Sequence, residues 1–186
     1  YVAAISGRID SLSRAHGLLA QGNWKGGDLR SIFDKETMGL HGGGKMRLRG
    51  PDVTLSASAV QPLSLLVHEL TTNAIKHGAL SVVLGSVSVD WSILANGDLN
   101  LHWVEHGGPA TAPPKTMGFG TQFIESLTSQ LQGAIVSHWQ HNGLLLELTL
   151  PASAVRLGGA TQQVAALTHP AQVVTGLRNK VLLVED

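Results

Sequence analysis

The sequence predicts an α+β fold in which helices cover one face of a mixed β-sheet. Three observations lead to this prediction. Apolar residues recur at helical spacing over 1–37 and 57–78, apolar and polar residues alternate over 87–103, and Asn96-Gly97 interrupts that alternation with the signal of a hairpin turn. Helices followed by a mixture of hairpins and helices indicate a two-layer sandwich. Apolar residues are 43% of the 186 residues, which is enough to fill its core.

Two helices are predicted at the start of the chain. The first covers residues 1–21, where apolar side chains form one stripe, and Gly22 ends the pattern. The second is shorter and covers 27–37. A Gly-rich, hairpin-like stretch follows, with short strands expected near 46–49 and 53–55.

A long helix and two pairs of strands are predicted next. The helix runs from about 57 to 78, begins at a cap formed by Ser56 or Ser58, and buries a stripe that includes Leu66 and Leu70. The later elements are, in chain order, a strand over 87–93, a strand over 99–103, a helix over 121–131, and strands over 134–140 and 144–150. We expect these strands to form one sheet with the helices on one face.

The composition divides the chain into four parts. The helical segment 1–37 precedes the main domain, which we place at 38–151. Residues 152–179 are rich in Ala, Gly, Thr, Gln and Val without a clear period, which is typical of a linker. The last part, 180–186, has the pattern of a buried strand that ends in two carboxylates, so we expect it to begin another domain.

Charge and composition exclude several classes of protein. Lysine plus arginine and aspartate plus glutamate number 13 each, which argues against a protein that binds nucleic acid by neutralising its phosphates. The absence of cysteine excludes disulfide scaffolds and thiolate zinc sites. No apolar run approaches the roughly 18 residues that span a bilayer, and the residues after Tyr1 do not form a signal peptide. We therefore expect a piece of a larger cytoplasmic protein, without nucleic-acid or membrane contacts of its own.

A polar motif lies on the predicted long helix. Glu69, Asn73 and Lys76 are spaced i, i+4 and i+7, so they share one helix face. Oxygen ligands suit Mg²⁺ and an ammonium group suits phosphate, so this face fits a magnesium-bound polyphosphate. The same spacing is also compatible with an ordinary solvated helix face.

A second motif stands at the end of a predicted strand, where Trp103-x-Glu105 precedes Gly107-Gly108. A carboxylate at such a loop edge can accept a hydrogen bond from an adenine amino group, while the glycines let the backbone approach the ring. Alone, this motif is also compatible with an ordinary exit from a strand into a turn.

A third motif, Gly118-Phe119-Gly120-Thr121, opens a predicted helix. Glycines leave backbone N–H groups accessible, and the N-terminus of a helix favours anions. Many junctions between a loop and a helix use glycine, so this motif too is weak by itself.

The order and spacing of the three motifs resemble the N, G1 and G2 boxes of the GHKL ATPase superfamily. They are most similar to the HWE family of sensor histidine kinases, which is named for a His in the N box and a Trp-x-Glu in the G1 box. Here these residues are His68, Trp103 and Glu105. Flanking residues that also agree are 14–19, 24, 28–29, 50–53, 76–81 and 113–114. The resemblance covers residues 8–150 and implies the two-layer α/β sandwich of the GHKL type.

The resemblance implies a site for ATP and Mg²⁺. Asn73 would bind the metal, Glu69 would lie near it as a ligand through water or as a polar helper, and Lys76 would reach phosphate; these three are the implied catalytic residues. Glu105 would replace the usual G1 aspartate that recognises adenine. The implied nucleotide-binding residues are His68, Asn73, Lys76, His77, Trp103, Glu105, Gly107, Gly108, Gly118, Phe119, Gly120 and Thr121. The segment from Pro109 to Met117 is expected to form a lid.

The resemblance also implies an activity and partners. Such kinases of bacterial two-component phosphorelays transfer the γ-phosphoryl group of ATP to a histidine on a dimerisation helix, and then to an aspartate of a response regulator. Residues 1–37 resemble the latter half of that helical hairpin, so the acceptor is expected upstream of Tyr1 rather than at His16. Residues 181–186 resemble the first strand of a receiver domain, which implies a hybrid kinase. An upstream sensor domain and a homodimer are further implied.

Two other functions stay open. One is a non-catalytic module that senses ATP and relays a signal by contact, and the other is a GHKL ATP hydrolase in which Glu69 activates water. The helix that contains His16 favours the kinase. A Walker A loop is disfavoured, because Met46 stands where the magnesium-binding hydroxyl belongs.

Overall fold

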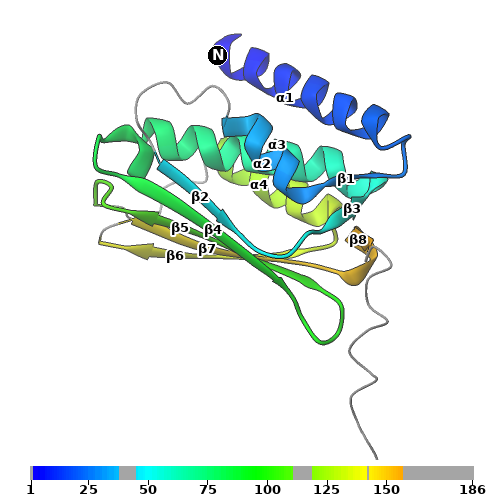
Figure 1. Ribbon diagram of the computed structural model, residues 1–186. Coiled ribbons are helices and arrows are strands. Elements are labelled where there is room, and N and C mark those ends of the chain that lie inside the picture. The colour runs from blue at the N-terminus through cyan, green and yellow to red at the C-terminus, as the bar shows by residue number, and fades with distance from the viewer. Residues whose placement is uncertain (1, 38–44, 111–118, 142, 157–186) are drawn as a thin grey trace, which may run out of the picture.

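The computed structural model describes residues 2–37, 45–110, 119–141 and 143–156. These residues form the predicted sandwich of helices on a mixed sheet, with one helix packed outside the two layers (Figure 1). The predicted strand over 180–186, most of the predicted linker and most of the predicted lid lie outside the described residues.

The helices follow the predicted amphipathic patterns closely. They are α1 (Val2–Gln21), α2 (Leu29–Thr37), α3 (Ala57–Lys76) and α4 (Phe119–Gln130), with the short 3-10 helices η1 (Ala79–Ser81) and η2 (Ala152–Ala154). Helix α3 packs against both α2 and α4, and α1 packs on α3 from the side away from the main sheet (Figure 1). Ser56 occupies the N-cap position of α3, as predicted, although its side chain makes no capping hydrogen bond.

The main sheet has five strands in the order β2-β4-β5-β7-β6. They are β2 (Lys45–Arg49), β4 (Ser86–Ile93), β5 (Leu99–His106), β6 (Ala134–Gln140) and β7 (Gly143–Leu150). Strand β2 runs parallel to β4 and the other neighbours are antiparallel, so the sheet is mixed, as predicted. Gly97 has a φ of +88° in the turn between β4 and β5, a conformation that favours glycine.

A second, three-stranded sheet corrects one prediction. Its antiparallel strands are, in order, β1 (Gly26–Asp28), β3 (Thr54–Ser56) and β8 (Val155–Arg156). The strands predicted near 46–49 and 53–55 therefore do not pair as a hairpin, because β2 joins the main sheet and β3 joins this small one. The small sheet also joins residues from both sides of positions 37 and 151.

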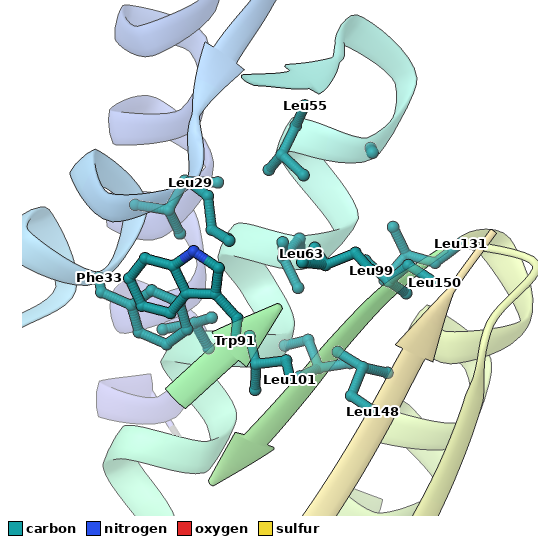
Figure 2. Packing of buried hydrophobic residues seen from close by; sticks show 14 of the residues in the cluster. Leu29, Phe33, Leu55, Leu63, Trp91, Leu99, Leu101, Leu131, Leu148 and Leu150 are labelled. Atoms are coloured by element: carbon teal, nitrogen blue, oxygen red, sulfur yellow. The ribbon is translucent and has the colours of Figure 1, made fainter. Parts of the chain in front are cut away.

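One core lies between the main sheet and the helices. The alternation in β4 and β5 turns Val89, Leu101 and their neighbours inward, where they meet α3. Figure 2 shows Leu63 of α3 close to Leu99 of β5, and Phe33 of α2 beside Trp91, whose ring is nearly parallel at 6.0 Å between centroids. Each such side chain contributes about 1.5–3 kcal/mol when fully buried. This packing fixes the end of α3 opposite the end of β5, where the polar motifs meet.

Candidate functional site

A cavity of about 410 Å³ lies between the C-terminal part of α3, helix α4 and strands β5, β6 and β7. Its volume is in the range of small-molecule and cofactor sites. Asn73, Glu105 and Thr121 all line it, so it joins the three motifs that are far apart in the sequence. The other lining residues are Leu70, His77, Gly78, Ile124, Glu125, Ile135, Ser137, Trp139, Leu144 and Leu146.

Much of the cavity wall is apolar and was missed by the sequence analysis. Strands β6 and β7 pair in antiparallel register, with Trp139 opposite Leu144 and Ile135 opposite Leu148. Alternation turns Ile135, Trp139, Leu144 and Leu146 to the helix side of the sheet, where they line the cavity. Both strands were predicted, but nothing in their sequences distinguishes the wall of a cavity from an ordinary sheet face. An apolar slot with few polar groups suits a flat ring with a polar edge.

Glu105 supplies a carboxylate at this cavity and is only 7% exposed. The backbone N–H of Ala79 donates to its Oε2 at 2.7 Å, and the indole Nε1–H of Trp103 donates to its Oε1 at 3.4 Å. Gly78 leaves room for this carboxylate, because a Cβ at that position would collide with it. A carboxylate has about four acceptor positions, so Glu105 can still accept from a ligand.

The position of Glu105 corrects one expectation. The predicted strand ends at residue 103, which would put Glu105 at a loop edge. Strand β5 instead continues to His106, so Glu105 is a buried strand residue. The cross-strand alternation with β4 accounts for this, because Glu105 stands opposite the buried Val87.

The three polar residues of α3 have different environments. Asn73 is exposed and lines the cavity, whereas Lys76 is exposed and lies outside the described lining. Glu69 is 6% exposed and pairs with Arg8 of α1, with Nε and Oε1 2.6 Å apart. Leu70 and Asn73 of α3 and its C-cap residue His77 line the cavity. They follow one another at i, i+3 and i+7, along a line slightly rotated from the one through Glu69 and Lys76. Asn73 therefore brings a side-chain amide to the cavity.

His68 faces α1 and α2, outside the described lining of the cavity. Its Nδ1 lies 2.9 Å from Oε2 of Glu36 on α2, which also accepts hydrogen bonds from Arg14 and Ser11 of α1. Because an ionised carboxylate only accepts hydrogen bonds, Nδ1 of His68 carries the hydrogen. Burial raises the pKa of Glu36, but the hydrogen bonds from His68, Arg14 and Ser11 and the charge of Arg14 lower it further, so the pKa lies below its ordinary value.

The G1 glycines support the end of β5 rather than line the cavity. Gly107 has a φ of +65°, and a Cβ on Gly108 would lie 2.7 Å from the Cα of Ala79. Both positions therefore favour glycine, one for its backbone conformation and the other for a close approach to η1. Through Ala79, this approach also helps to position the N–H that Glu105 accepts.

Helix α4 begins at Phe119 of the G2 motif, two residues before the predicted start at residue 121. Phe119, whose side chain is 63% exposed, is the first residue of α4, and Gly120 and Thr121 follow in its first turn. Thr121 lines the cavity. Gly118 lies outside the described residues.

The donor set of the cavity bears on the kind of ion it could hold. Within the described ranges, no group of three or more His, Cys, Asp or Glu side chains could hold a metal ion. A cation at Asn73 would therefore need further oxygen ligands from a bound molecule, which is how Mg²⁺ is usually held beside nucleotide phosphates.

In the described part of the chain, no helix combines the length and the apolar character that crossing a membrane requires.

The chain is similar to known histidine kinases. Residues 1–52 match the family described as HWE histidine kinase. A blue-light-activated histidine kinase of Rhizobium johnstonii is 36% identical over 157 residues, which are 82% of this chain and 45% of that protein. One of Brucella anthropi is 34% identical over 155 residues, which are 80% of this chain and 32% of that protein. The chain thus spans less than half the length of these relatives.

Solved structures share the fold. The histidine kinase domain of the blue-light activated histidine kinase EL346 from Erythrobacter litoralis has a TM-score of 0.67 at 17% identity, covering 80% of this chain and 74% of that one. The histidine kinase AdeS from Acinetobacter baumannii has a TM-score of 0.56 at 14% identity, covering 81% of this chain and 80% of that one. These likenesses confirm the predicted two-layer sandwich.

Proposed function

Since this chain belongs to the HWE histidine kinase family, we infer that its cavity binds ATP with Mg²⁺ and that the whole protein phosphorylates a histidine. The phosphoryl group then passes to an aspartate of a response regulator or of a fused receiver domain. The observation that carries this proposal is the convergence of Asn73, Glu105 and Thr121, from three separate motifs, on one cavity.

Glu105 recognises the adenine ring in this proposal. Its carboxylate accepts a hydrogen bond from the exocyclic amino group, while the apolar side chains of β6 and β7 contact the ring. Guanine presents a carbonyl oxygen in place of that amino group, and two acceptors repel each other. A site built around one hydrogen-bonding edge rejects the analogue that lacks it, so the cavity selects ATP over GTP.

Asn73, Lys76 and the first turn of α4 act on the polyphosphate. Phosphoryl transfer depends mainly on positioning and on stabilisation of charge, and bound Mg²⁺ neutralises charge on the phosphate oxygens. The amide oxygen of Asn73 is a neutral ligand for the cation. Lys76 lies three residues further along α3, where its ammonium group can bind a phosphate. Thr121 and the backbone N–H groups in the first turn of α4 favour the anionic end of the nucleotide.

Labelled ATP separates this function from its alternatives. The full-length protein is incubated with γ-labelled ATP, and acid-labile label on the protein is compared with released phosphate. Acid-labile label supports the kinase. Phosphate release without label indicates a hydrolase, and nucleotide binding without either reaction indicates a sensing module.

The same assay identifies the acceptor. His16 is exposed and contacts Trp24 edge-to-face, with ring centroids 4.9 Å apart. We propose that the acceptor lies upstream of Tyr1, so His16→Gln retains the label of the full-length protein. Loss of label in this variant, with ATP binding unchanged, identifies His16 as the acceptor instead.

A further inference from the structure

Arg8 of α1 joins three helices beside the proposed nucleotide site. Its Nε–H donates to Oε1 of Glu69 on α3 at 2.6 Å. The central carbon of its guanidinium group lies 4.9 Å from the ring centroid of Phe119 and 4.4 Å from that of Phe123, both on α4. The two rings are stacked, with 14° between their planes. One cation thus contacts a carboxylate of one helix and two aromatic rings of another.

The ion pair in this cluster is largely sheltered from water, whereas Phe119 is exposed. The side chains of Arg8 and Glu69 are only 19% and 9% exposed. Ion pairs and cation–π contacts are stronger when water is excluded, and a buried carboxylate that loses its partner is left uncompensated. Gly7 permits the approach, because a Cβ on it would lie 2.9 Å from Nε2 of His68. The sequence thus lets α1 come close enough to α3 for Arg8 to reach Glu69.

The contacts of Arg8 lie next to the end of the site assigned to phosphate. A Cβ on Gly120 would lie 3.9 Å from Oε2 of Glu69, so the start of α4 is close to this carboxylate. Thr121, the next residue, lines the cavity, as does Asn73 one turn beyond Glu69 on α3. Because Arg8 links Glu69 of α3 to the rings of α4, it also holds Thr121 of α4 in place relative to Asn73 of α3. Glu105, by contrast, is held by Trp103 and Ala79.

We propose that Arg8 is a positioning residue for the polyphosphate end of the nucleotide site, a role that rests on the proposed binding of ATP. By linking Glu69 to Phe119 and Phe123, it holds the first turn of α4 at the distance from α3 that a bound polyphosphate requires. Helix α1 thereby controls how tightly phosphate, but not adenine, is bound.

The test compares two arginines of α1. Arg8→Ala removes the link to α4. Arg14→Ala removes an ion pair between α1 and Glu36 of α2, and neither residue of that pair belongs to α4. Arg8→Lys keeps a positive charge near Glu69 but loses the planar group that stacks on the rings. The affinity of the full chain for ATP·Mg²⁺ is measured by calorimetry, and that for adenosine by NMR titration. Thermal melting checks that each variant is folded.

Arg8→Ala should bind ATP·Mg²⁺ about tenfold more weakly, with adenosine affinity unchanged, and Arg8→Lys should be intermediate. Arg14→Ala should leave both affinities unchanged even where it lowers the melting temperature. If Arg8→Ala is not folded, Arg8→Lys decides the question by the same comparison. Equal loss of ATP and adenosine binding, an equal effect of Arg14→Ala, or no effect of the Arg8 substitutions would each overturn the role of Arg8. A wild-type chain that binds neither ligand would instead overturn the proposed function itself.

Discussion

Trp103 and Glu105 stand two residues apart on the inner face of β5, and the indole N–H of Trp103 donates to the carboxylate of Glu105 at 3.4 Å. Trp103 is fully buried and Glu105 lines the cavity, so the tryptophan supports the carboxylate from within the core. This relationship gives a physical reason for the spacing of the Trp-x-Glu motif, because only alternate residues of a strand share one face.

We predict that Trp103→Phe weakens ATP binding by about three- to tenfold, because Glu105 loses a hydrogen bond that orients it. The matched control is Trp91→Phe. Trp91 is also buried in the main sheet, and its indole N–H donates to the carbonyl oxygen of Pro51 at 2.8 Å. Both variants should lose about 1–3 kcal/mol of unfolding free energy, measured by urea denaturation. Calorimetry should show weaker ATP binding only in Trp103→Phe, and equal affinities in the two variants would contradict this role.

We predict that Asn73→Ala largely uncouples ATP binding from Mg²⁺. The side chain is exposed at the cavity, so its loss should leave the fold intact while removing one oxygen ligand. The factor by which Mg²⁺ raises ATP affinity should fall by about tenfold or more in calorimetric titrations with and without the metal. Asn73→Asp should instead alter the metal dependence, because it adds a negative charge beside the phosphates.

Gln61→Ala is the control for Asn73, because Gln61 is exposed on the same helix and lies outside the described lining of the cavity. It should respond to Mg²⁺ as the wild type does. If Mg²⁺ strengthens ATP binding to Asn73→Ala as much as to the wild type, Asn73 is not a ligand.

We predict that Glu36 stabilises the fold in a pH-dependent way. Its pKa is lowered in the folded state, so its contribution is fully present above the unfolded value of about 4.5 and is lost as the pH falls through the folded value. Glu36→Gln should therefore be about 1–3 kcal/mol less stable than the wild type at pH 7. Urea denaturation at a series of pH values should show this difference shrinking below about pH 4.5. A difference that stays constant down to pH 3 would contradict the lowered pKa.

The periodic elements could be predicted from the sequence, and the short ones could not. Helix α3 and the β4–β5 hairpin carry long patterns, and both were predicted to within a few residues. Strands β1 and β8 span three and two residues, too few for any alternation to be visible. Their pairing with β3 depends on tertiary contacts, which no local pattern records.

The candidate site, like the fold, could be predicted only in part. The motifs around Asn73, Glu105 and Thr121 were recognisable by their residue types and spacing, and all three line the cavity. The ionic contacts of Glu36 and Arg8 were not predicted, because their partners are up to 61 residues away in the sequence. Nor does a sequence distinguish a strand residue that lines a cavity from one that fills the core.

The binding of ATP through Glu105 is tested most directly by calorimetry on the wild type and Glu105→Gln. The glutamine keeps the shape of the side chain, and its oxygen can still accept from Ala79, so the fold should survive. Its NH₂ group, however, donates where the carboxylate accepted. We expect the wild type to bind ATP·Mg²⁺ and to bind GTP·Mg²⁺ much more weakly, and Glu105→Gln to lose at least about tenfold in ATP affinity. Unchanged ATP affinity in a folded Glu105→Gln, or equal affinity of the wild type for ATP and GTP, would contradict the account.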